Sequence, residues 1–400
     1  MGDFMDFETY KLYFDNASTT PIDENVIPII TNALKHNNYN PSSLYIDGRK
    51  NYEIILKAKE DIVNIINADS KEQIFFTSGG TEGNNWVIRG YIDYLYKSKK
   101  YNIYNKTIKP HIITDTIEHH SVLNTIKFLE ELNLVEVTYI KPDIETGEIK
   151  YSQIKDAIKP NTELISIMTI NNVLGTVNNI LDIGSLCKEN NIKFHTDAVQ
   201  AVGKININVN FYNIDFLTCS GHKIHCPKGI GFVYIRNSKE ICPLLNGGLQ
   251  EYGLRAGTEN VAYIQALQYC INKYANKEYI TLRTKKINIL QNYLFNKLNN
   301  IFTDKIIFCG ANGIINISFK NVISDSLTWQ LGQCNIFVSV GSACDNGSFE
   351  GNYILKEMRY PKEYINGNIR LSFDERNSIE DCNRFILMLK ELIQNQRGYI

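Results

Sequence analysis

Short apolar segments alternate with helical segments through the first two thirds of the chain. Between residues 48 and 68, apolar side chains recur every three or four positions, as on the buried face of a helix. Seven short apolar runs are typical of buried strands: residues 74–76, 112–113, 135–137, 164–167, 193–195, 216–218 and 231–234. Strands that alternate with helices predict a mostly parallel sheet wrapped by helices, which is an α/β fold.

The pattern changes near residue 263. From there the sequence predicts a long helical segment, a strand over residues 313–319 and a closing amphipathic helix over residues 379–394. A chain of 400 residues is long enough for a large domain and a smaller one. We therefore expect an N-terminal segment over residues 1–15, a large domain over 16–262 and a small C-terminal α/β domain over 263–400.

Composition narrows the class of protein. The 42 basic residues balance 43 acidic ones, whereas a nucleic-acid-binding protein needs a basic face. The nine cysteines include no C-x-x-C pair, which favours free thiols in a reducing compartment. The N-terminal sequence resembles neither a signal peptide nor a transit peptide, and no apolar run reaches the ~20 residues of a membrane span. We expect a cytoplasmic protein that binds neither nucleic acid nor membrane.

Two residues after predicted strands suggest the chemistry. Lys223 follows Ser220 and His222, and Asp197 lies earlier in the chain, at the end of the predicted strand that begins at residue 193. An amine can hold the aldehyde of pyridoxal 5′-phosphate as a Schiff base, and a carboxylate can keep the pyridine nitrogen of that cofactor protonated. Taken alone, each is more often a surface lysine or a capping aspartate. Together they favour pyridoxal phosphate.

A glycine pair offers a place for the phosphate. Residues 76–82 read as a strand, a Gly79-Gly80 turn and a helix start, and such a turn can direct backbone amides at an anion. An ordinary strand-to-helix turn is the alternative, and the Gly-Lys-Ser/Thr of a Walker loop is missing.

With residues 13–21 and 368–373, these segments make almost the whole chain resemble the cysteine desulfurases. These are pyridoxal-phosphate enzymes of the class V aminotransferase type, with fold type I. The resemblance implies that Gly80, Thr81, Ser220 and His222 hold the phosphate. It further implies that His119 stacks on the cofactor ring, that Asn172 and Gln200 contact its phenolic oxygen, and that Arg370 and Asn172 bind the substrate. Thr258 would reach the phosphate from a second subunit, so we expect a homodimer.

The segment over residues 339–347 places Cys344 among small residues in a predicted loop. An exposed cysteine of this kind can react as a thiolate, and the segment resembles the Ser-Gly-Ser-Ala-Cys motif of the long-loop desulfurases. The resemblance implies that Lys223, His119 and Cys344 are catalytic and that L-cysteine becomes L-alanine. The sulfur would pass to Cys344 as a persulfide and then to an acceptor protein, with an iron–sulfur scaffold as one candidate.

Three alternatives stay open at this point. A related pyridoxal-phosphate enzyme such as a selenocysteine lyase would share Lys223 and Asp197 but would not need Cys344. A catalytically inactive scaffold could keep the fold, although the complete residue set argues against it. A soft-metal cluster could form from Cys219, His222, His225 and Cys226, but we expect no metal because the phosphate needs His222. Val173 also stands where the family commonly has an acid.

Overall fold

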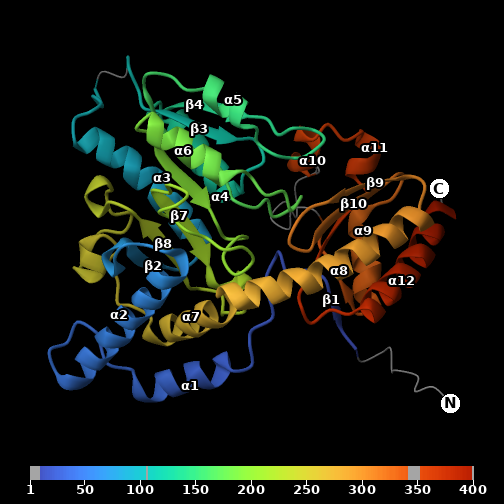
Figure 1. The fold of residues 1–400 in the computed structure, drawn as a ribbon, viewed down its shortest axis with the longest axis horizontal. Helices are drawn as coiled ribbons and strands as arrows, with labels where there is room; N and C mark the ends of the chain where they lie inside the picture. Colours follow the sequence, from blue (N-terminus) through green and yellow to red (C-terminus); the bar gives the residue numbers. More distant parts are fainter. Residues whose placement is uncertain (1–9, 105–106, 341–351, 399–400) are drawn as a thin grey trace.

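The computed structural model describes residues 10–104, 107–340 and 352–398, and a seven-stranded sheet lies at its centre (Figure 1). Strand β8 is antiparallel to both of its neighbours, and the other paired strands of this sheet are parallel. In spatial order the strands are β2 (Ile74–Thr77), β8 (Gly231–Ile235), β7 (Phe216–Ser220), β6 (Lys193–Asp197), β5 (Thr162–Ser166), β3 (His111–Asp115) and β4 (Glu136–Ile140). All seven predicted strands are therefore present.

Helices cover both faces of this sheet, because successive side chains of a strand point to opposite faces. Phe75 of β2 packs with Trp86 under α3 (Gly80–Lys97) and α4 (His120–Glu131). Its neighbours Ile74 and Phe76 pack into a second core on the other face. The helices with buried residues in that second core include α1 (Val26–His36), α2 (Ile46–Ile66), α5 (Tyr151–Asp156), α6 (Ile180–Glu189) and α7 (Val261–Tyr274). The predicted α/β fold with a mostly parallel sheet is confirmed.

A smaller unit has its own hydrophobic core and its own sheets. Its strands are β9 (Lys305–Cys309), β10 (Ile314–Phe319) and β12 (Asn368–Ser372) in one antiparallel sheet, and β1 (Leu12–Tyr13) and β11 (Ile336–Phe337) in a parallel pair. Its core is lined by the helices α8 (Lys277–Ile301), α9 (Ser324–Gln333) and α12 (Ile379–Gly398). Two short helices, α10 (Tyr353–Glu357) and α11 (Lys362–Ile365), instead place apolar residues against the core of the large unit. The predicted strand over 313–319 and the closing helix are both present, as β10 and α12.

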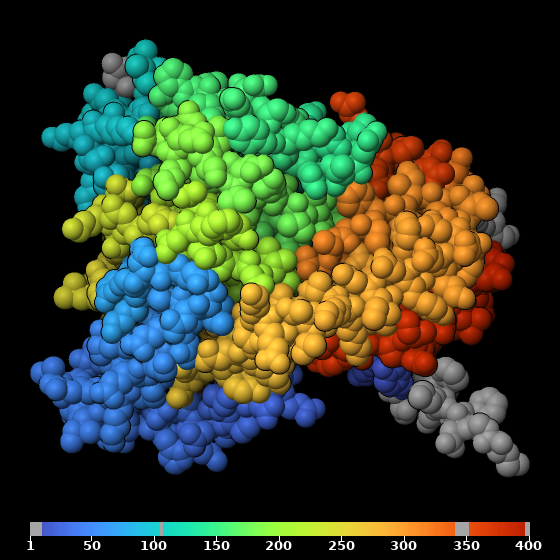
Figure 2. Space-filling model, viewed as in Figure 1, coloured from blue at the N-terminus to red at the C-terminus, as the bar shows by residue number. Residues whose placement is uncertain are grey.

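Two helices join the units. The predicted long helical segment after residue 263 is in fact α7 and α8, separated where the Asn276 side chain accepts a hydrogen bond from Tyr279 N and caps α8. Residues of α7 pack in the core of the large unit, and residues of α8 pack in the core of the small one. Figures 1 and 2 show α8 running from the large unit onto the small one. The predicted domain boundary after residue 262 lies within α7 and stays a prediction.

Among the residues that the structure describes, no helix combines the length and the apolar character that a membrane crossing requires.

Candidate functional site

Ten of the twelve residues singled out in the sequence line one cavity of about 280 Å³. The cavity lies beyond the carboxyl ends of the parallel strands, where open α/β sheets bind their ligands. Those ten residues are Gly80, Thr81, His119, Asn172, Asp197, Gln200, Ser220, His222, Lys223 and Arg370. Segments far apart in the sequence thus meet at one place.

Lys223 projects its amine at the wall of this cavity. It ends the short helical turn Gly221–Lys223, which follows β7 directly. Its Nζ donates hydrogen bonds to the carbonyl oxygens of Ala17, at 2.6 Å, and Ser18, at 2.5 Å. Both acceptors are neutral carbonyl oxygens, and the amine can exchange these two hydrogen bonds for bonds to a ligand.

Asp197 lies at the end of β6 and is 6% exposed. Its Oδ2 accepts a hydrogen bond of 2.7 Å from Asn84 Nδ2, and its Oδ1 accepts one from the backbone N–H of Val199 at 2.9 Å. Hydrogen bonds from two donors hold this buried carboxylate in one position. Asp197 can therefore present a fixed negative charge to a ligand in the cavity.

His119 caps the N-terminus of α4. Its Nδ1 accepts a hydrogen bond from the backbone N–H of Ser121 at 3.1 Å, so the proton of the neutral ring is on Nε2. Burial lowers the pKa of His119, although the negative charge of Asp197 opposes this shift. A neutral, flat imidazole with a fixed tautomer is suited to stack on a ring and to exchange a proton through Nε2.

The Gly79-Gly80 turn and the start of α3 form a cradle for an anion. Gly79 has φ +150°, and a Cβ on Gly80 would lie 2.7 Å from Val199 Cγ2, so the close approach of these segments requires glycine. Ser220 and His222 line the same cavity, and Ser220 Oγ lies 3.4 Å from the position that a Cβ on Gly79 would take. Burial and the nearby charge of Lys223 lower the pKa of His222 to about 4, which leaves it a neutral hydrogen-bonding group at pH 7.

Arg370 reaches the cavity from β12 of the small unit and is 1% exposed. Its Nη2 donates to Asp15 Oδ1 at 2.8 Å and to Ser18 Oγ at 2.5 Å, and its Nη1 donates to the carbonyl oxygen of Asn172 at 2.9 Å. Asn172 Oδ1 is buried and has no hydrogen-bond partner among the described residues. A guanidinium and an unpaired amide oxygen at one wall provide places for a carboxylate and a donor group of a ligand.

Two predicted residues are not in the cavity. Thr258 is exposed and does not line it, so any contact of Thr258 with a phosphate would have to be made in another subunit. Cys344 lies outside the described residues.

Sequence reasoning missed several residues that hold the site together. Asn84 donates to Ser121 Oγ at 2.8 Å as well as to Asp197, and so connects the carboxylate to the His119 cap. Its spacing of four residues from Gly80 places both on one face of α3, which was a usable signal. Tyr353 also lines the cavity, its ring centroid lies 4.7 Å from that of His120, and no pattern in the sequence indicates it.

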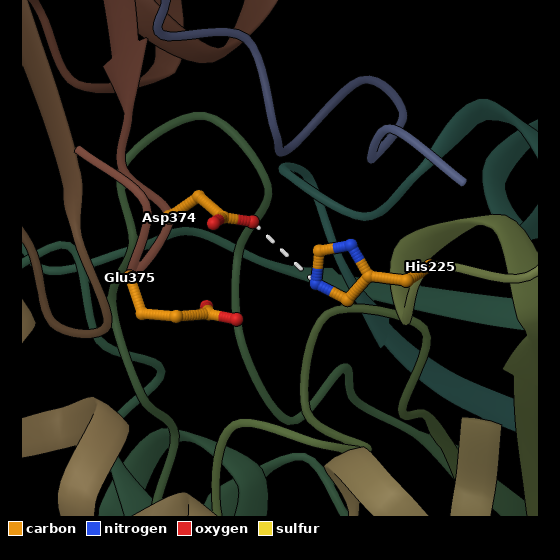
Figure 3. Close-up of side chains that lie close together, drawn as sticks. All are labelled: His225, Asp374 and Glu375. Atoms are coloured by element: carbon orange, nitrogen blue, oxygen red, sulfur yellow. Dashed lines mark ion pairs between the residues drawn. The ribbon is translucent and has the colours of Figure 1, made fainter. Parts of the chain in front are cut away.

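The alternative Cys/His metal cluster does not assemble, because His225 points to the small unit. His225, Asp374 and Glu375 bring their ligand atoms within 4.8 Å of one another (Figure 3). However, Arg376 donates to both carboxylate oxygens of Asp374 at 2.7 Å, and the Tyr279 hydroxyl donates to Glu375. Both oxygens of Asp374 and Oε1 of Glu375 are thus bonded within the protein, so we interpret the group as a polar network between the units.

Comparison with known proteins identifies the family. The class V aminotransferase family model matches residues 12–385. A cysteine desulfurase IscS from Methanosarcina thermophila is 38% identical over 99% of this chain and 95% of its own length. A cysteine desulfurase from a Nostoc species is 37% identical over 97% of this chain and 94% of its own. The chain belongs to the cysteine desulfurases.

Solved structures of similar proteins share this fold. A NifS-like protein superimposes with a TM-score of 0.86 at 29% identity, covering 96% of this chain and all of its own. SspA, solved in complex with cysteine, superimposes with a TM-score of 0.78 at 33% identity, covering 92% of this chain and all of its own. The fold type I assignment made from the sequence is therefore confirmed for this cysteine desulfurase.

Proposed function

We propose that this cysteine desulfurase uses pyridoxal 5′-phosphate to convert L-cysteine to L-alanine, and that the sulfur passes to Cys344 as a persulfide and then to an acceptor protein. The observation that carries the proposal is the meeting of Lys223, Asp197, His119 and Arg370 in one cavity. The complex of the relative SspA with cysteine supports cysteine as the substrate.

The cavity fits the cofactor by its chemistry. It offers an amine, a carboxylate fixed by two hydrogen bonds and an anion cradle at a helix N-terminus. When bound, pyridoxal phosphate supplies an electron sink for the charge that develops when a proton leaves the substrate Cα. Lys223 would anchor it, and Asp197 would keep its ring nitrogen protonated.

Different residues of the chain would carry out the binding, proton-transfer and sulfur-transfer steps. Arg370 and Asn172 bind and orient the substrate carboxylate, Lys223 takes the Cα proton, and His119 moves protons at its Nε2. The thiolate of Cys344 attacks the substrate sulfur, so that a sulfur–sulfur bond forms and the carbon–sulfur bond breaks. A proton returns to the carbon to give L-alanine. An acceptor protein, with an iron–sulfur scaffold as a candidate, finally takes the outer sulfur from Cys344.

Cofactor binding is tested by colour. Wild-type protein given pyridoxal phosphate should gain a visible absorbance band, and Lys223→Ala should lose it. Lys228→Ala removes an exposed lysine five residues away and should keep the band. A wild type without the band would overturn the cofactor assignment.

The sulfur step is tested separately at Cys344. Cys344→Ser should bind pyridoxal phosphate normally but produce neither alanine nor a protein persulfide, because a hydroxyl is a poor nucleophile toward sulfur. Cys309→Ser, which removes an exposed thiol on β9, should remain active. Mass spectrometry of the wild type after brief exposure to cysteine should place the added sulfur on the Cys344 peptide. Full activity of Cys344→Ser would favour a simple lyase.

We also propose a homodimer in which Thr258 completes the partner's phosphate site. Its loop presents apolar side chains to solvent, with Leu249 88% exposed and Leu44 of a neighbouring loop 83% exposed. Subunit mixing tests the arrangement. Lys223→Ala and Thr258→Asp are each inactive as homodimers in this proposal, but their mixed dimer contains one intact site. Random reassociation should restore about a quarter of wild-type activity, and no recovery would contradict the shared site.

A further inference from the structure

Two acids lie buried behind the part of the cavity wall that carries His119. Asp115 ends β3, Glu118 immediately precedes His119, and both acids are 0% exposed. The proposed reaction uses neither of them. Oδ2 of Asp115 and Oε2 of Glu118 are buried, and no N–H or O–H group of the described residues donates to either oxygen. Buried polar atoms normally have a hydrogen-bond partner, so these two oxygens require an explanation.

The two carboxyl groups are close enough to form a hydrogen bond with each other. If both were ionised, two like charges would face each other away from water, which is a costly arrangement. A single proton between them removes one charge and supplies the missing donor, because a protonated carboxyl group donates and a carboxylate accepts. The geometry therefore favours a pair that holds a proton at neutral pH.

The surroundings place this proton on Glu118. The backbone N–H of Ile117 donates to Asp115 Oδ1 at 2.8 Å, which favours the charged form of Asp115. Burial and the negative charges of Asp115 and Asp197 raise the pKa of Glu118 well above its ordinary value. Burial raises the pKa of Asp115 as well, but only to about 7.

Glu118 also connects three parts of the cavity wall. Its Oε1 accepts a hydrogen bond from the backbone N–H of Met168, and its carbonyl oxygen accepts one from the Tyr353 hydroxyl at 2.6 Å. Met168, Tyr353 and the adjacent His119 all line the cavity. The ring of His119 is neutral and the Tyr353 hydroxyl is bonded to the backbone, so neither places a charge beside Glu118.

We propose that Glu118 is a positioning residue that keeps a proton at neutral pH and donates it to Asp115, which fixes the turn before His119 at the cavity wall. The inference rests on the proposed function for the part that His119 plays in turnover, whereas the proton on Glu118 can be tested without substrate. Glu118→Gln has the shape of a protonated glutamate, because its nitrogen can donate to Asp115 and its oxygen can accept from Met168. Glu118→Leu offers neither group.

Urea unfolding at pH 5, 6 and 7 tests for the proton. An unfolded chain has released the protons of its glutamates in this range, whereas the folded wild type keeps that of Glu118, so the stability it contributes is lost as the pH rises. The unfolding equilibrium constant of the wild type, divided by that of Glu118→Gln, should rise about tenfold per pH unit. Asp115 is present in both proteins, so its own titration largely cancels.

The control for this measurement is Glu131→Gln, which makes the same substitution at an exposed position at the end of α4. The corresponding ratio for Glu131→Gln should not change with pH, because an exposed carboxylate titrates alike in the folded and unfolded chains. A constant ratio for Glu118→Gln would mean that Glu118 is ionised in the folded protein and would overturn the inference.

Alanine release at pH 7 tests the positioning role. Glu118→Gln should keep kcat within about twofold of the wild type, because it retains both hydrogen bonds, and Glu118→Leu should lower kcat about ten- to a hundredfold, because small displacements near reacting atoms are costly. Full activity of Glu118→Leu, or a Glu118→Gln protein as impaired as Glu118→Leu, would overturn the role. If Glu118→Leu does not fold, the kcat and the pH dependence of Glu118→Gln decide alone. A wild type without alanine release would instead contradict the proposed function and leave the unfolding test intact.

Discussion

Replacing Glu251 by glutamine should lower the free energy of unfolding by about 3–4.5 kcal/mol, because it removes the carboxylate that is paired with the buried ammonium of Lys59. The side chains of this ion pair are each 3% exposed. The Lys59 amine lies 5.4 Å from the ring centroid of Phe75 and 5.0 Å from that of Tyr252. The aromatic faces attract the cation but cannot replace a carboxylate.

The cost of deprotonating the lysine sets an upper limit to this penalty. A stranded ammonium can lose its proton, and for a lysine of ordinary pKa this costs about 4.6 kcal/mol at pH 7. The penalty of Glu251→Gln cannot exceed that cost, and it should shrink by about 1.4 kcal/mol for each pH unit above 7. The substitution keeps Oε1, which accepts from the backbone N–H of Phe76 at 3.2 Å, so the loss of charge is the main change.

Urea unfolding at pH 7 and pH 9 measures this penalty. The fluorescence of Trp86 reports on the region, since its ring lies 5.5 Å from that of Phe75. The double variant with Lys59→Met removes both charges and should recover stability to within about 1 kcal/mol of the wild type. Equal penalties at the two pH values, or a Glu251→Gln protein as stable as the wild type, would refute the reasoning.

Three further predictions concern other parts of the molecule. Arg370→Lys should raise KM for cysteine by about ten- to a hundredfold with a smaller change in kcat, measured by alanine release, because lysine cannot reproduce the guanidinium fork. Gly184→Ala should destabilise the protein by about 1–3 kcal/mol in urea unfolding, since its Cβ would meet the Tyr212 carbonyl oxygen at 1.8 Å, whereas Gly332→Ala, with nothing within 4 Å, should not. Burial lowers the pKa of His195 to about 3, so its unfolded form takes up a proton first as the pH falls below 6.5. From pH 7 to pH 5 the wild type should therefore lose about 2 kcal/mol relative to His195→Gln in parallel denaturant titrations, and equal losses would contradict this.

The fold class could be predicted because the apolar periodicity is strong wherever a strand is buried on both faces. All seven strands of the central sheet gave apolar runs, including the partly exposed edge strand β4, and the topology rule then placed Asp197 and Lys223 at one edge. The two-residue strands β1 and β11 carry no periodicity and could not be found. The break between α7 and α8 was missed because its signal is one capping side chain, Asn276.

The site was predictable in its reactive groups but not in their support. A reactive amine or thiol has a recognisable local context, whereas a supporting contact depends on where distant segments meet. The carbonyl oxygen of Ala17 accepts from both Gln200 and Lys223, and nothing near residue 17 indicates this. The link from Asn84 to Asp197 spans 113 residues in the sequence.

The contacts of the N-terminal segment with the C-terminal part of the chain have a consequence for folding during protein synthesis. Asp15 bonds to Arg370 across 355 residues, and β1 pairs with β11 near the other end of the chain. A ribosome adds about 5–20 residues per second, so the first residues to emerge wait on the order of half a minute for these partners. The large sheet can form earlier, but the side of the cavity that Arg370 closes stays open until translation is nearly complete. During synthesis the large sheet can therefore fold before the active site is complete. A prematurely terminated chain should keep much of the sheet but lack a closed site.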